Sequence, residues 1–259
     1  MKLSIITINY NNCKGLEKTF QSVFNQSIKD IEYIIIDGGS TDGSYELIKT
    51  NASRFGYFIS ERDNGIYHAM NKGIAKAAGD YLLFINSGDS LANETVIEKM
   101  LDGEDGKIDL IYGDLKMVYP DGTVTISKMP DFLTVDHMME RTLFHPVTLI
   151  HRRLFGEYGY YDERLKIVAD WAFFLKVIIL GTVSSKHKEI VVSEYTMDGI
   201  SSQESNLEKI DQERSWVKAN YLSQAFRSHY EEYKIYKQFY HHKWVARARK
   251  LAPKLGYSI

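Results

Sequence analysis

Short apolar runs alternate along the first half of the chain with segments whose apolar residues recur at helical spacing. The runs Leu3–Ile8, Ile31–Ile36, Tyr57–Ser60 and Tyr81–Ile85 have the length and composition of strands buried in a parallel sheet. Segments such as Leu16–Phe24 show the spacing of helices with one apolar face. This alternation predicts an α/β fold with a doubly wound, mostly parallel sheet.

The alternation of predicted strands and helices ends near residue 114, where a predicted hairpin begins. Ile108–Tyr112 is a predicted strand that ends at Gly113-Asp114, and Leu115–Tyr119 and Thr123–Ile126 flank Pro120-Asp121-Gly122. A turn of this composition between two such runs is a hairpin signal. Mixed strands are therefore expected in the second half of the domain.

The second half continues with a predicted strand at Val147–Ile150 and an apolar helix that opens at Ile167–Leu175. From Leu207 onward the chain is helical in pattern and rich in tyrosine and basic residues. We therefore expect one α/β domain over residues 1–203, with its change of character near 114, and a C-terminal helical appendage over residues 204–259.

Composition narrows the class of protein. A chain of 259 residues with 44% hydrophobic and 25% charged residues fits one large domain with an appendage and a full core. A net charge of -2 gives no reason to expect a nucleic-acid partner. The single cysteine, Cys13, excludes an internal disulfide and a cysteine-based metal cluster. Because no apolar stretch is long enough for a signal peptide or a membrane span, we expect a cytoplasmic protein.

Polar residues follow three predicted strands at their carboxyl ends, the edge where open α/β sheets bind ligands. Asn9–Asn11 follows the first strand, Asp37-Gly38-Gly39-Ser40-Thr41-Asp42-Gly43-Ser44 the second and Asn86-Ser87-Gly88-Asp89 the fourth. Glycines let a backbone approach a ligand closely, and Asp37 can accept from an N–H or a hydroxyl. Alternatively, Ser40 or Thr41 caps the next helix. The segment is neither a dinucleotide-binding nor a Walker loop, because it lacks their spacing and lysine.

Two aspartates are candidates for chemistry. Asp89 supplies a hard oxygen ligand of the kind that Mg²⁺ and Mn²⁺ prefer, or else Asp89 or Ser90 caps a helix beginning near Leu91. Asp170 lies near the amino terminus of the apolar helix, where the helix dipole stabilises a carboxylate. It is either a first-turn capping acid or part of a cleft wall, since Trp171 and Phe173 flank it.

Taken together, these segments resemble family 2 glycosyltransferases of the GT-A fold, the bacterial type that builds surface polysaccharides. The resemblance covers roughly residues 2–202 and rests on ordered motifs at sensible spacing. These motifs are Thr7-Ile8-Asn9-Tyr10-Asn11, Asp37 to Ser44, Asp63-Asn64-Gly65-Ile66-Tyr67 with Ala69-Met70-Asn71-Lys72-Gly73, Asn86-Ser87-Gly88-Asp89, and Ala169-Asp170.

The resemblance implies a role for each motif. Asp170 matches the catalytic base of the family, and Asp89 stands at the last position of its D-x-D metal motif, which implies Mn²⁺ or Mg²⁺ as cofactor. The remaining motif residues are implied to bind the nucleotide sugar: Thr7, Asn9, Tyr10, Asp37, Gly38, Ser40, Asp63, Gly65, Asn71 and Asn86. Residues 1–114 would then form the nucleotide-sugar half, and residues 115–203 the acceptor half.

The sequence departs from the family pattern at three places. Ser87 stands where the first aspartate of D-x-D is expected, which implies a weaker metal ligand or a water in its place. His68 stands where relatives often carry aspartate, and His145-Pro146 where they often carry His-Gln. These departures leave the choice of donor and acceptor open.

The resemblance also implies an activity. The expected reaction is inverting transfer of a sugar from a nucleotide-sugar donor, with UDP the expected nucleotide, to a hydroxyl of a glycan or lipid-linked acceptor in bacterial polysaccharide synthesis. A sugar-nucleotide pyrophosphorylase is an alternative. That chemistry requires a glycine-rich, basic loop after the first strand, and this chain has Asn9–Asn12 there instead. A degenerate sugar-nucleotide-binding module is suggested by Ser87, whereas the presence of both Asp89 and Asp170 argues against it.

The C-terminal appendage has two interpretations. Its basic residues greatly outnumber its acids from Arg227 onward, and aromatic residues are interleaved with them. It is either a packing helix with a solvated basic face or a helix on an anionic membrane surface, which would put the protein at the inner face of the cell membrane. Before it, Gly199, Ser201 and Ser202 form a small-residue loop that could move over a site.

Overall fold

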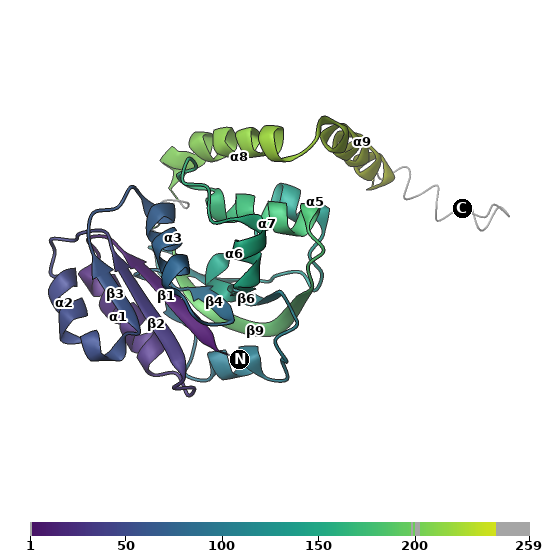
Figure 1. Ribbon diagram of the computed structural model, residues 1–259. Coiled ribbons are helices and arrows are strands. Elements are labelled where there is room, and N and C mark those ends of the chain that lie inside the picture. The colour runs from purple at the N-terminus through teal and green to yellow at the C-terminus, as the bar shows by residue number, and fades with distance from the viewer. Residues whose placement is uncertain (1, 198, 200–202, 242–259) are drawn as a thin grey trace. The chain divides into compact units, whose positions relative to one another are not determined.

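Four parallel strands form the first half of the sheet, in the spatial order β3 (Tyr57–Ser60), β2 (Ile31–Asp37), β1 (Leu3–Asn9) and β4 (Tyr81–Phe84) (Figure 1). The computed structural model describes residues 2–197, 199 and 203–241. Its chain divides into two compact units between residues 210 and 211.

The parallel register places the ends of the strands side by side. Asn9 at the end of β1 pairs with Asp37 at the end of β2, and Asp37 pairs with Ser60 at the end of β3. The polar residues that follow these strands therefore meet at one edge of the sheet, as the sequence predicts.

Helices cover both faces of these parallel strands. The connecting helices are α1 (Cys13–Phe24), α2 (Ser44–Thr50) and α3 (Ile66–Lys76). Leu16 of α1 shares a buried cluster with Ile5, whereas α3 packs on the other face, next to Ile6, because successive side chains of a strand point to opposite faces. A Cβ atom at Gly73 of α3 would lie 2.5 Å from Cγ2 of Ile6, so this glycine lets the helix approach the sheet closely.

The second half of the sheet is mixed. Strand β8 (Thr148–His151) joins the halves, since it runs antiparallel to both β4 and β6 (Leu110–Val118). Beyond β6 lie β9 (Ser185–Thr196), which is parallel to β6, and β5 (Ser90–Leu91), which is antiparallel to β9. Strand β7 (Val124–Ser127) forms a hairpin with β6.

The remaining helices follow the strands in chain order. They are η1 (Ala52–Arg54), α4 (Val96–Leu101), α5 (Val135–Glu140), η2 (His145–Val147), α6 (Arg153–Tyr158), α7 (Ala169–Leu180), η4 (Glu204–Asn206), α8 (Leu207–Tyr221) and α9 (Gln224–His241). The predicted mostly parallel α/β sheet is thus confirmed. The hairpin is confirmed as well, with the Tyr119 N–H donating to the Thr123 carbonyl at 2.9 Å.

The predicted strand end at Gly113-Asp114 is wrong, because β6 continues through both residues. A Cβ atom at Gly113 would lie 2.6 Å from the carbonyl oxygen of Ile190, so the glycine lets β9 approach β6. The Asp114 carboxylate accepts from the Met129 N–H at 2.9 Å and faces Nε2 of His187 at 3.1 Å, which satisfies it inside the sheet.

The alternative interpretation of Asp89, a helix that begins near Leu91, is contradicted by the structure. Ser90 and Leu91 form β5, whose partners on β9 are Glu194 and Ser193. The backbone after Asp89 is therefore tied to the sheet, and the alternative in which Asp89 or Ser90 caps a helix at Leu91 does not hold.

The C-terminal helices α8 and α9 confirm the predicted helical pattern over the described residues. In α9 the side chains of Ile235, Tyr236 and Phe239 are 67%, 72% and 67% exposed. No helix in the part of the chain that the structure describes is long and apolar enough to cross a membrane. Outside that part lie Ser201 and Ser202 of the small-residue loop and, in residues 242–259, the last basic and aromatic residues of the appendage.

Candidate active site

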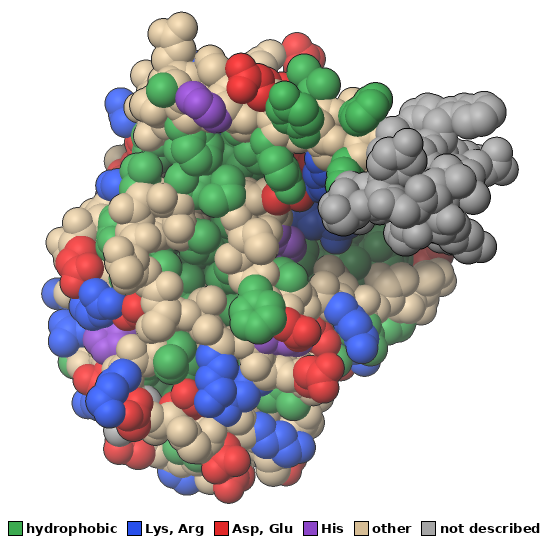
Figure 2. All heavy atoms as spheres, turned by 90° about the vertical axis from the view of Figure 1, so that its right-hand side faces the viewer, with side chains coloured by type: hydrophobic (Ala, Val, Ile, Leu, Met, Phe, Trp, Pro, Cys, Tyr) green, Lys and Arg blue, Asp and Glu red, His purple; other side chains and the backbone are tan. Residues whose placement is uncertain are grey.

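A cavity of about 720 Å³ lies beyond the carboxyl ends of the parallel strands. Loops after β1, β2, β3 and β4 line it, together with α3, η2, the start of α7 and the end of β9. On the face shown in Figure 2, acidic and basic side chains are interspersed over the lower part of the surface. Of the residues predicted for the site, the cavity brings together Asn9, Tyr10, Gly38, Asp63, Gly65, Asn86, Asp89 and Asp170.

Thr7 and Asn71 are two of the four predicted site residues that do not line the cavity; Asp37 and Ser40 are the others. The Thr7 hydroxyl donates to the carbonyl of Ile85 at 2.6 Å and lies 3.0 Å from the hydroxyl of Tyr33, so it links three strands. Asn71 on α3 donates to the carbonyl of Tyr161 at 2.9 Å and accepts from its N–H at 3.0 Å. Neither lines the cavity, and Asn71 instead holds the loop before α7 against α3.

Asp37 is the hydrogen-bonding centre of the loop after β2. Its carboxylate, which is fully buried, accepts from Asn9 Nδ2 at 2.7 Å, from the N–H and the hydroxyl of Ser40 at 3.0 and 2.5 Å, and from the Ser60 hydroxyl at 2.5 Å. Burial alone would raise the pKa of Asp37, but the hydrogen bonds from Ser40, Ser60 and Asn9 hold it below its ordinary value. Asp37 and Ser40 therefore shape the loop from behind, and Ser40 does not cap α2, whose N-cap residue is Gly43.

Asn9 carries an unsatisfied acceptor next to the cavity. Its side-chain amide nitrogen is held by Asp37, which leaves the oxygen, Oδ1, on the other side. That oxygen is buried and has no hydrogen-bond partner among the described residues. An unpaired buried acceptor is costly, and this oxygen is closed off from the cavity that Asn9 helps to line.

Tyr10, Gly38 and Asp63 form a niche in the cavity wall. The Tyr10 side chain is 67% exposed. A Cβ atom at Gly38 would lie 2.6 Å from Oδ2 of Asp63 and 3.1 Å from Cδ2 of Tyr10. The other oxygen of Asp63 accepts from the Gly65 N–H at 2.9 Å, and Gly65 has a φ of 118°, which favours glycine. A planar ring with a hydrogen-bond donor at its edge matches this combination of aromatic face and carboxylate.

The loop that carries Asp89 is held by α1. The Thr19 hydroxyl accepts from the Gly88 N–H at 3.1 Å and donates to the Asp89 carbonyl at 2.7 Å. Asn12 Nδ2 donates to the carbonyl of Ser87 at 3.1 Å, and Gly88 has a φ of 103°. These bonds hold the backbone of the loop, while Asp89, at 5% exposure, lines the cavity.

The donor set at this loop fits a metal that is held jointly with a substrate. Among residues 2–197, 199 and 203–241 no three His, Cys, Asp or Glu side chains are placed to hold a metal ion together. Mg²⁺-type ions are often bound through one or two carboxylates, with substrate phosphates and waters completing the shell. Asp89 can supply that carboxylate, and Ser87 beside it can contribute no second charge.

Asp170 lies in the first turn of α7 and lines the same cavity. One carboxylate oxygen faces the Tyr67 hydroxyl at 2.9 Å, and the other faces Nδ1 of His145 at 3.1 Å. Burial alone would raise the pKa of Asp170, but the hydrogen bond and electrostatic attraction of His145 and the bond from Tyr67 hold it below its ordinary value. These contacts favour the ionised form of the carboxylate, which is the form that can accept a proton.

Several residues at the cavity were not predicted for the site from sequence. Tyr67 and His145 lay within recognised motifs, but their contacts with Asp170 span 103 and 25 residues and depend on the fold. Arg62, Lys166 and Tyr195 also line the cavity. Their sequence context gives no signal, since each stands in a charged or mixed segment of ordinary composition. His68 does not line the cavity, and its Nδ1 accepts from the Asn64 N–H at 3.1 Å.

Comparisons with known proteins identify the class to which this fold and site belong. The family model described as "Glycosyl transferase family 2" matches residues 4–151, more than half of the chain. The chain therefore belongs to glycosyl transferase family 2, and it is a glycosyltransferase with the GT-A fold. The fold and family implied by the sequence motifs are both confirmed.

Individual relatives agree with this placement. The chain is 29% identical over 202 residues to the "PGL/p-HBAD biosynthesis glycosyltransferase" of Mycobacterium bovis, a match that covers 76% of this chain and 77% of that protein. It is similar in structure to S. aureus TarS 1-349 in complex with UDP-GlcNAc, with a TM-score of 0.65, 17% identity and coverage of 86% and 68%. It spans 37% of a longer TarS chain. Mannosyltransferase PcManGT from Pyrobaculum calidifontis, in complex with GDP-Man and Mn²⁺, gives a TM-score of 0.56, 15% identity and coverage of 76% and 57%.

Proposed function

We propose that this protein transfers a sugar, with inversion, from a UDP-sugar donor to a hydroxyl of a glycan or lipid-linked acceptor in bacterial polysaccharide synthesis. The observation that carries the proposal is that one cavity holds the hydrogen-bonded Asp170, the Asp89 loop and the niche of Tyr10, Gly38 and Asp63. These are the base, the diphosphate region and the nucleoside region that such a reaction needs. In this proposal residues 1–114 bind the donor, residues 115–203 bind the acceptor and residues 204–259 form the helical appendage.

The nucleoside binds in the niche. The uracil ring lies against the exposed Tyr10 ring, and its N–H donates to Asp63 Oδ2 beside Gly38. Asp37 and Ser40 support binding from behind, because they fix the loop that carries Gly38. A structural relative with UDP-GlcNAc bound supports the choice of a uridine nucleotide.

The diphosphate binds beside the Ser87–Asp89 loop. Asp89 would hold Mn²⁺ or Mg²⁺ together with the donor's phosphates, and a bound divalent ion supplies neutralising charge for the departing nucleotide. Arg62 and Lys166 line the same cavity and add positive charge near it. Asn86 also lines this cavity and would contact the donor sugar.

Asp170 acts as general base in a single displacement. The acceptor oxygen attacks the anomeric carbon from the face opposite the diphosphate, while its proton passes to the Asp170 carboxylate. The bond between the anomeric carbon and the diphosphate oxygen breaks, and its electron pair leaves with UDP. Because one displacement occurs, the configuration inverts and no covalent enzyme intermediate is needed.

The appendage carries the proposed membrane contact. Its helix α9 exposes Ile235, Tyr236 and Phe239, and the sequence after this helix contains basic residues and no acids. An apolar face combined with positive charge suits binding to an anionic bilayer surface, where a lipid-linked acceptor would lie. Localisation at the inner face of the cell membrane follows from this proposal.

The decisive experiment compares the wild type with Asp170→Asn. Asparagine keeps the shape of the side chain but cannot take up the acceptor's proton. We expect UDP release from UDP-GlcNAc or UDP-glucose in the presence of Mn²⁺ to fall by about 10² to 10⁴-fold, the usual contribution of a positioned base. Affinity for UDP should remain near that of the wild type. Unchanged turnover would remove Asp170 from the reaction, and a wild type that binds UDP but turns over neither donor would contradict the proposed donor.

A further inference from the structure

Both carboxylate oxygens of Asp170 have a hydrogen-bonding neighbour, but one of these neighbours, Tyr67, also has a second acceptor within reach. The Tyr67 hydroxyl lies 2.9 Å from Oδ1 of Asp170 and 2.6 Å from the carbonyl oxygen of Ile167. A hydroxyl has one hydrogen, and both neighbours are acceptors while Asp170 is ionised. Tyr67 must therefore divide its donation between them, so it cannot by itself fix the carboxylate.

His145 can fix the other oxygen if its ring carries hydrogen on the right nitrogen. Nδ1 lies 3.1 Å from Oδ2 of Asp170, and Nε2 lies 3.3 Å from Nδ2 of Asn86. The amide nitrogen of Asn86 is a donor, so Nε2 accepts and Nδ1 bears the hydrogen that Asp170 accepts. The ring packs edge-on against Phe84, with ring centroids 6.2 Å apart, which limits its rotation.

The chain Asp170–His145–Asn86 connects α7 to the loop after β4 through the ring on η2. Asn86 directly precedes the Ser87–Asp89 loop, and Asp170 is on α7 at the acceptor side. The side-chain oxygen of Asn86 is left without a described partner, so its orientation is set by the amide nitrogen that His145 accepts from. His145 therefore stands where a single ring can orient the proposed base and a donor-side amide together.

We propose that His145 is the positioning residue of this active site: its Nδ1–H orients the Asp170 carboxylate, while its Nε2 orients Asn86. This inference rests on the proposed function for its catalytic consequence. His145 itself takes no proton from the acceptor and forms no bond to the donor. It acts through the two residues that it holds.

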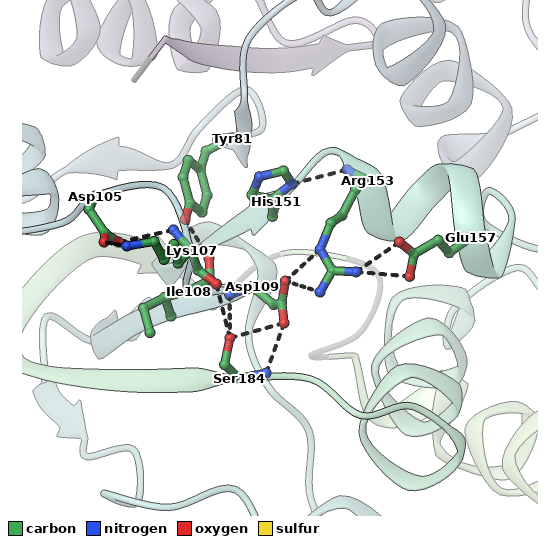
Figure 3. Close-up of polar contacts among 9 residues, drawn as sticks. All are labelled: Tyr81, Asp105, Lys107, Ile108, Asp109, His151, Arg153, Glu157 and Ser184. Atoms are coloured by element: carbon green, nitrogen blue, oxygen red, sulfur yellow. Dashed lines mark hydrogen bonds and ion pairs between the residues drawn. The ribbon is translucent and has the colours of Figure 1, made fainter.

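Three substitutions separate the two contacts. In His145→Asn the amide nitrogen falls near the position of Nδ1, so the contact with Asp170 is retained and that with Asn86 is lost. In His145→Gln the longer side chain reaches the position of Nε2 and retains the Asn86 side. His145→Ala removes both. His151→Asn is the control, because His151 is a half-buried histidine at the opposite end of β8, where its Nδ1 accepts from the Arg153 N–H (Figure 3).

The kinetic readout uses UDP release from UDP-GlcNAc or UDP-glucose with Mn²⁺. We expect His145→Ala to lower kcat by about 10²-fold, the effect of a misplaced reacting group, with the donor KM changed much less. His145→Asn should recover most of that loss, and His151→Asn should match the wild type. Equal defects in His145→Asn and His145→Ala, or a raised donor KM at normal kcat, would overturn the orienting role toward Asp170. If His145→Ala does not fold, kcat of His145→Asn is compared with kcat of His145→Gln. A higher kcat in His145→Asn supports the orienting role toward Asp170, and equal values overturn it.

The pH profile adds a readout that loss of packing would not move. The titratable groups that face Asp170 are His145 on η2, Tyr67 on α3 and Tyr161 on the loop before α7. Because the hydrogen bond from His145 favours the ionised carboxylate, its removal should raise the pKa of Asp170. The acidic limb of kcat should then shift to higher pH in His145→Ala, and by less in His145→Asn, which keeps the hydrogen bond but not the electrostatic attraction of the ring.

A measurement without turnover keeps this inference separate from the proposed function. The ¹⁵N shifts of the His145 ring at about pH 8, above the ordinary pKa of histidine, report which nitrogen carries hydrogen. We expect Nδ1 to carry hydrogen, and finding hydrogen on Nε2 alone would overturn the inference. If neither donor is turned over, the proposed donor is wrong and the ring measurement still decides the role of His145. If Asp170→Asn is inactive but His145→Ala is normal, the inference alone fails.

Discussion

Asp63 occupies the space that a side chain at position 38 would need. A Cβ atom built on Gly38 would lie 2.6 Å from Oδ2 of Asp63, well inside contact distance. The glycine and the carboxylate are therefore complementary, although they follow different strands. Both line the cavity next to Tyr10, so this pair sets the shape of the proposed nucleoside niche.

We expect Gly38→Ala to weaken UDP binding, because the added methyl group displaces the Asp63 carboxylate from the niche. The loss should be about 1.5–3 kcal/mol, the range for a hydrogen bond to a charged group, as measured by titration calorimetry. Gly156→Ala on α6 is the matched control, since its added Cβ would meet no atom within 4 Å. The niche assignment is wrong if both variants bind UDP like the wild type.

Asp37→Asn is expected to lower both the stability of the fold and the affinity for UDP. Its carboxylate accepts from Asn9, Ser40 and Ser60, and an amide would place N–H hydrogens against some of these donors. We expect the free energy of unfolding to fall by about 2 kcal/mol or more, with weaker UDP binding because the Gly38 loop loses its support. Urea denaturation and calorimetry measure the two effects. Wild-type stability in the variant would mean that the loop is held by other contacts.

The same carboxylate predicts a pH dependence of stability. Hydrogen bonds hold the pKa of Asp37 below its ordinary value, so the folded state binds fewer protons there than the unfolded state. This contribution to stability is present above the unfolded pKa of about 3.9, and it is lost as the pH falls through the lower folded pKa. The urea midpoint of the wild type should therefore drop steeply below about pH 4, and the drop should be shallower in Asp37→Asn. Parallel curves for the two proteins would contradict the assignment.

The gathering of the strand-end motifs could be predicted from the sequence, because parallel pairing brings the carboxyl ends of strands to one edge. Asn9, Asp37 and Ser60 lie in register there. The sequence could not tell which polar residues at this edge face the cavity, since that depends on hydrogen bonds made across the fold. Asp37 is turned inward by partners on two other strands, whereas Asp63 lies in the niche.

The second half of the sheet was less predictable for a physical reason. Strand β9 mixes charged and apolar residues, and only Val192 and Ser193 of its length are buried. Its pairing with β6 depends on the irregular register near Gly113, where the absence of a side chain permits close approach. A local pattern carries no signal for such a contact. The position of Asp170 at the start of α7, by contrast, could be predicted, because a strongly apolar helix follows it directly.

Asp89→Ala tests the proposed metal role. With one carboxylate at the loop, we expect a divalent ion to bind chiefly together with the diphosphate. Calorimetry should show that the wild type binds UDP more tightly with Mn²⁺ than without it. In Asp89→Ala that difference should disappear, while the metal-free affinity stays near the wild-type value. An unchanged effect of Mn²⁺ in Asp89→Ala would exclude Asp89 as the ligand.

Ser87→Asp tests whether this loop is short of one metal ligand. Ser87 lines the cavity, and its carbonyl is held by Asn12 Nδ2, so the backbone position is fixed before any substitution. A second carboxylate on the same loop would add charge and a hard oxygen ligand, which Mg²⁺ and Mn²⁺ prefer. We therefore expect Ser87→Asp to bind Mn²⁺ more tightly in the absence of nucleotide, and Ser87→Ala, the matched control, to behave like the wild type. Titration of each variant with Mn²⁺ alone, followed by calorimetry, measures the difference. If Ser87→Asp gains no affinity, position 87 does not face the ion, and Asp89 would have to bind it with the diphosphate and water alone.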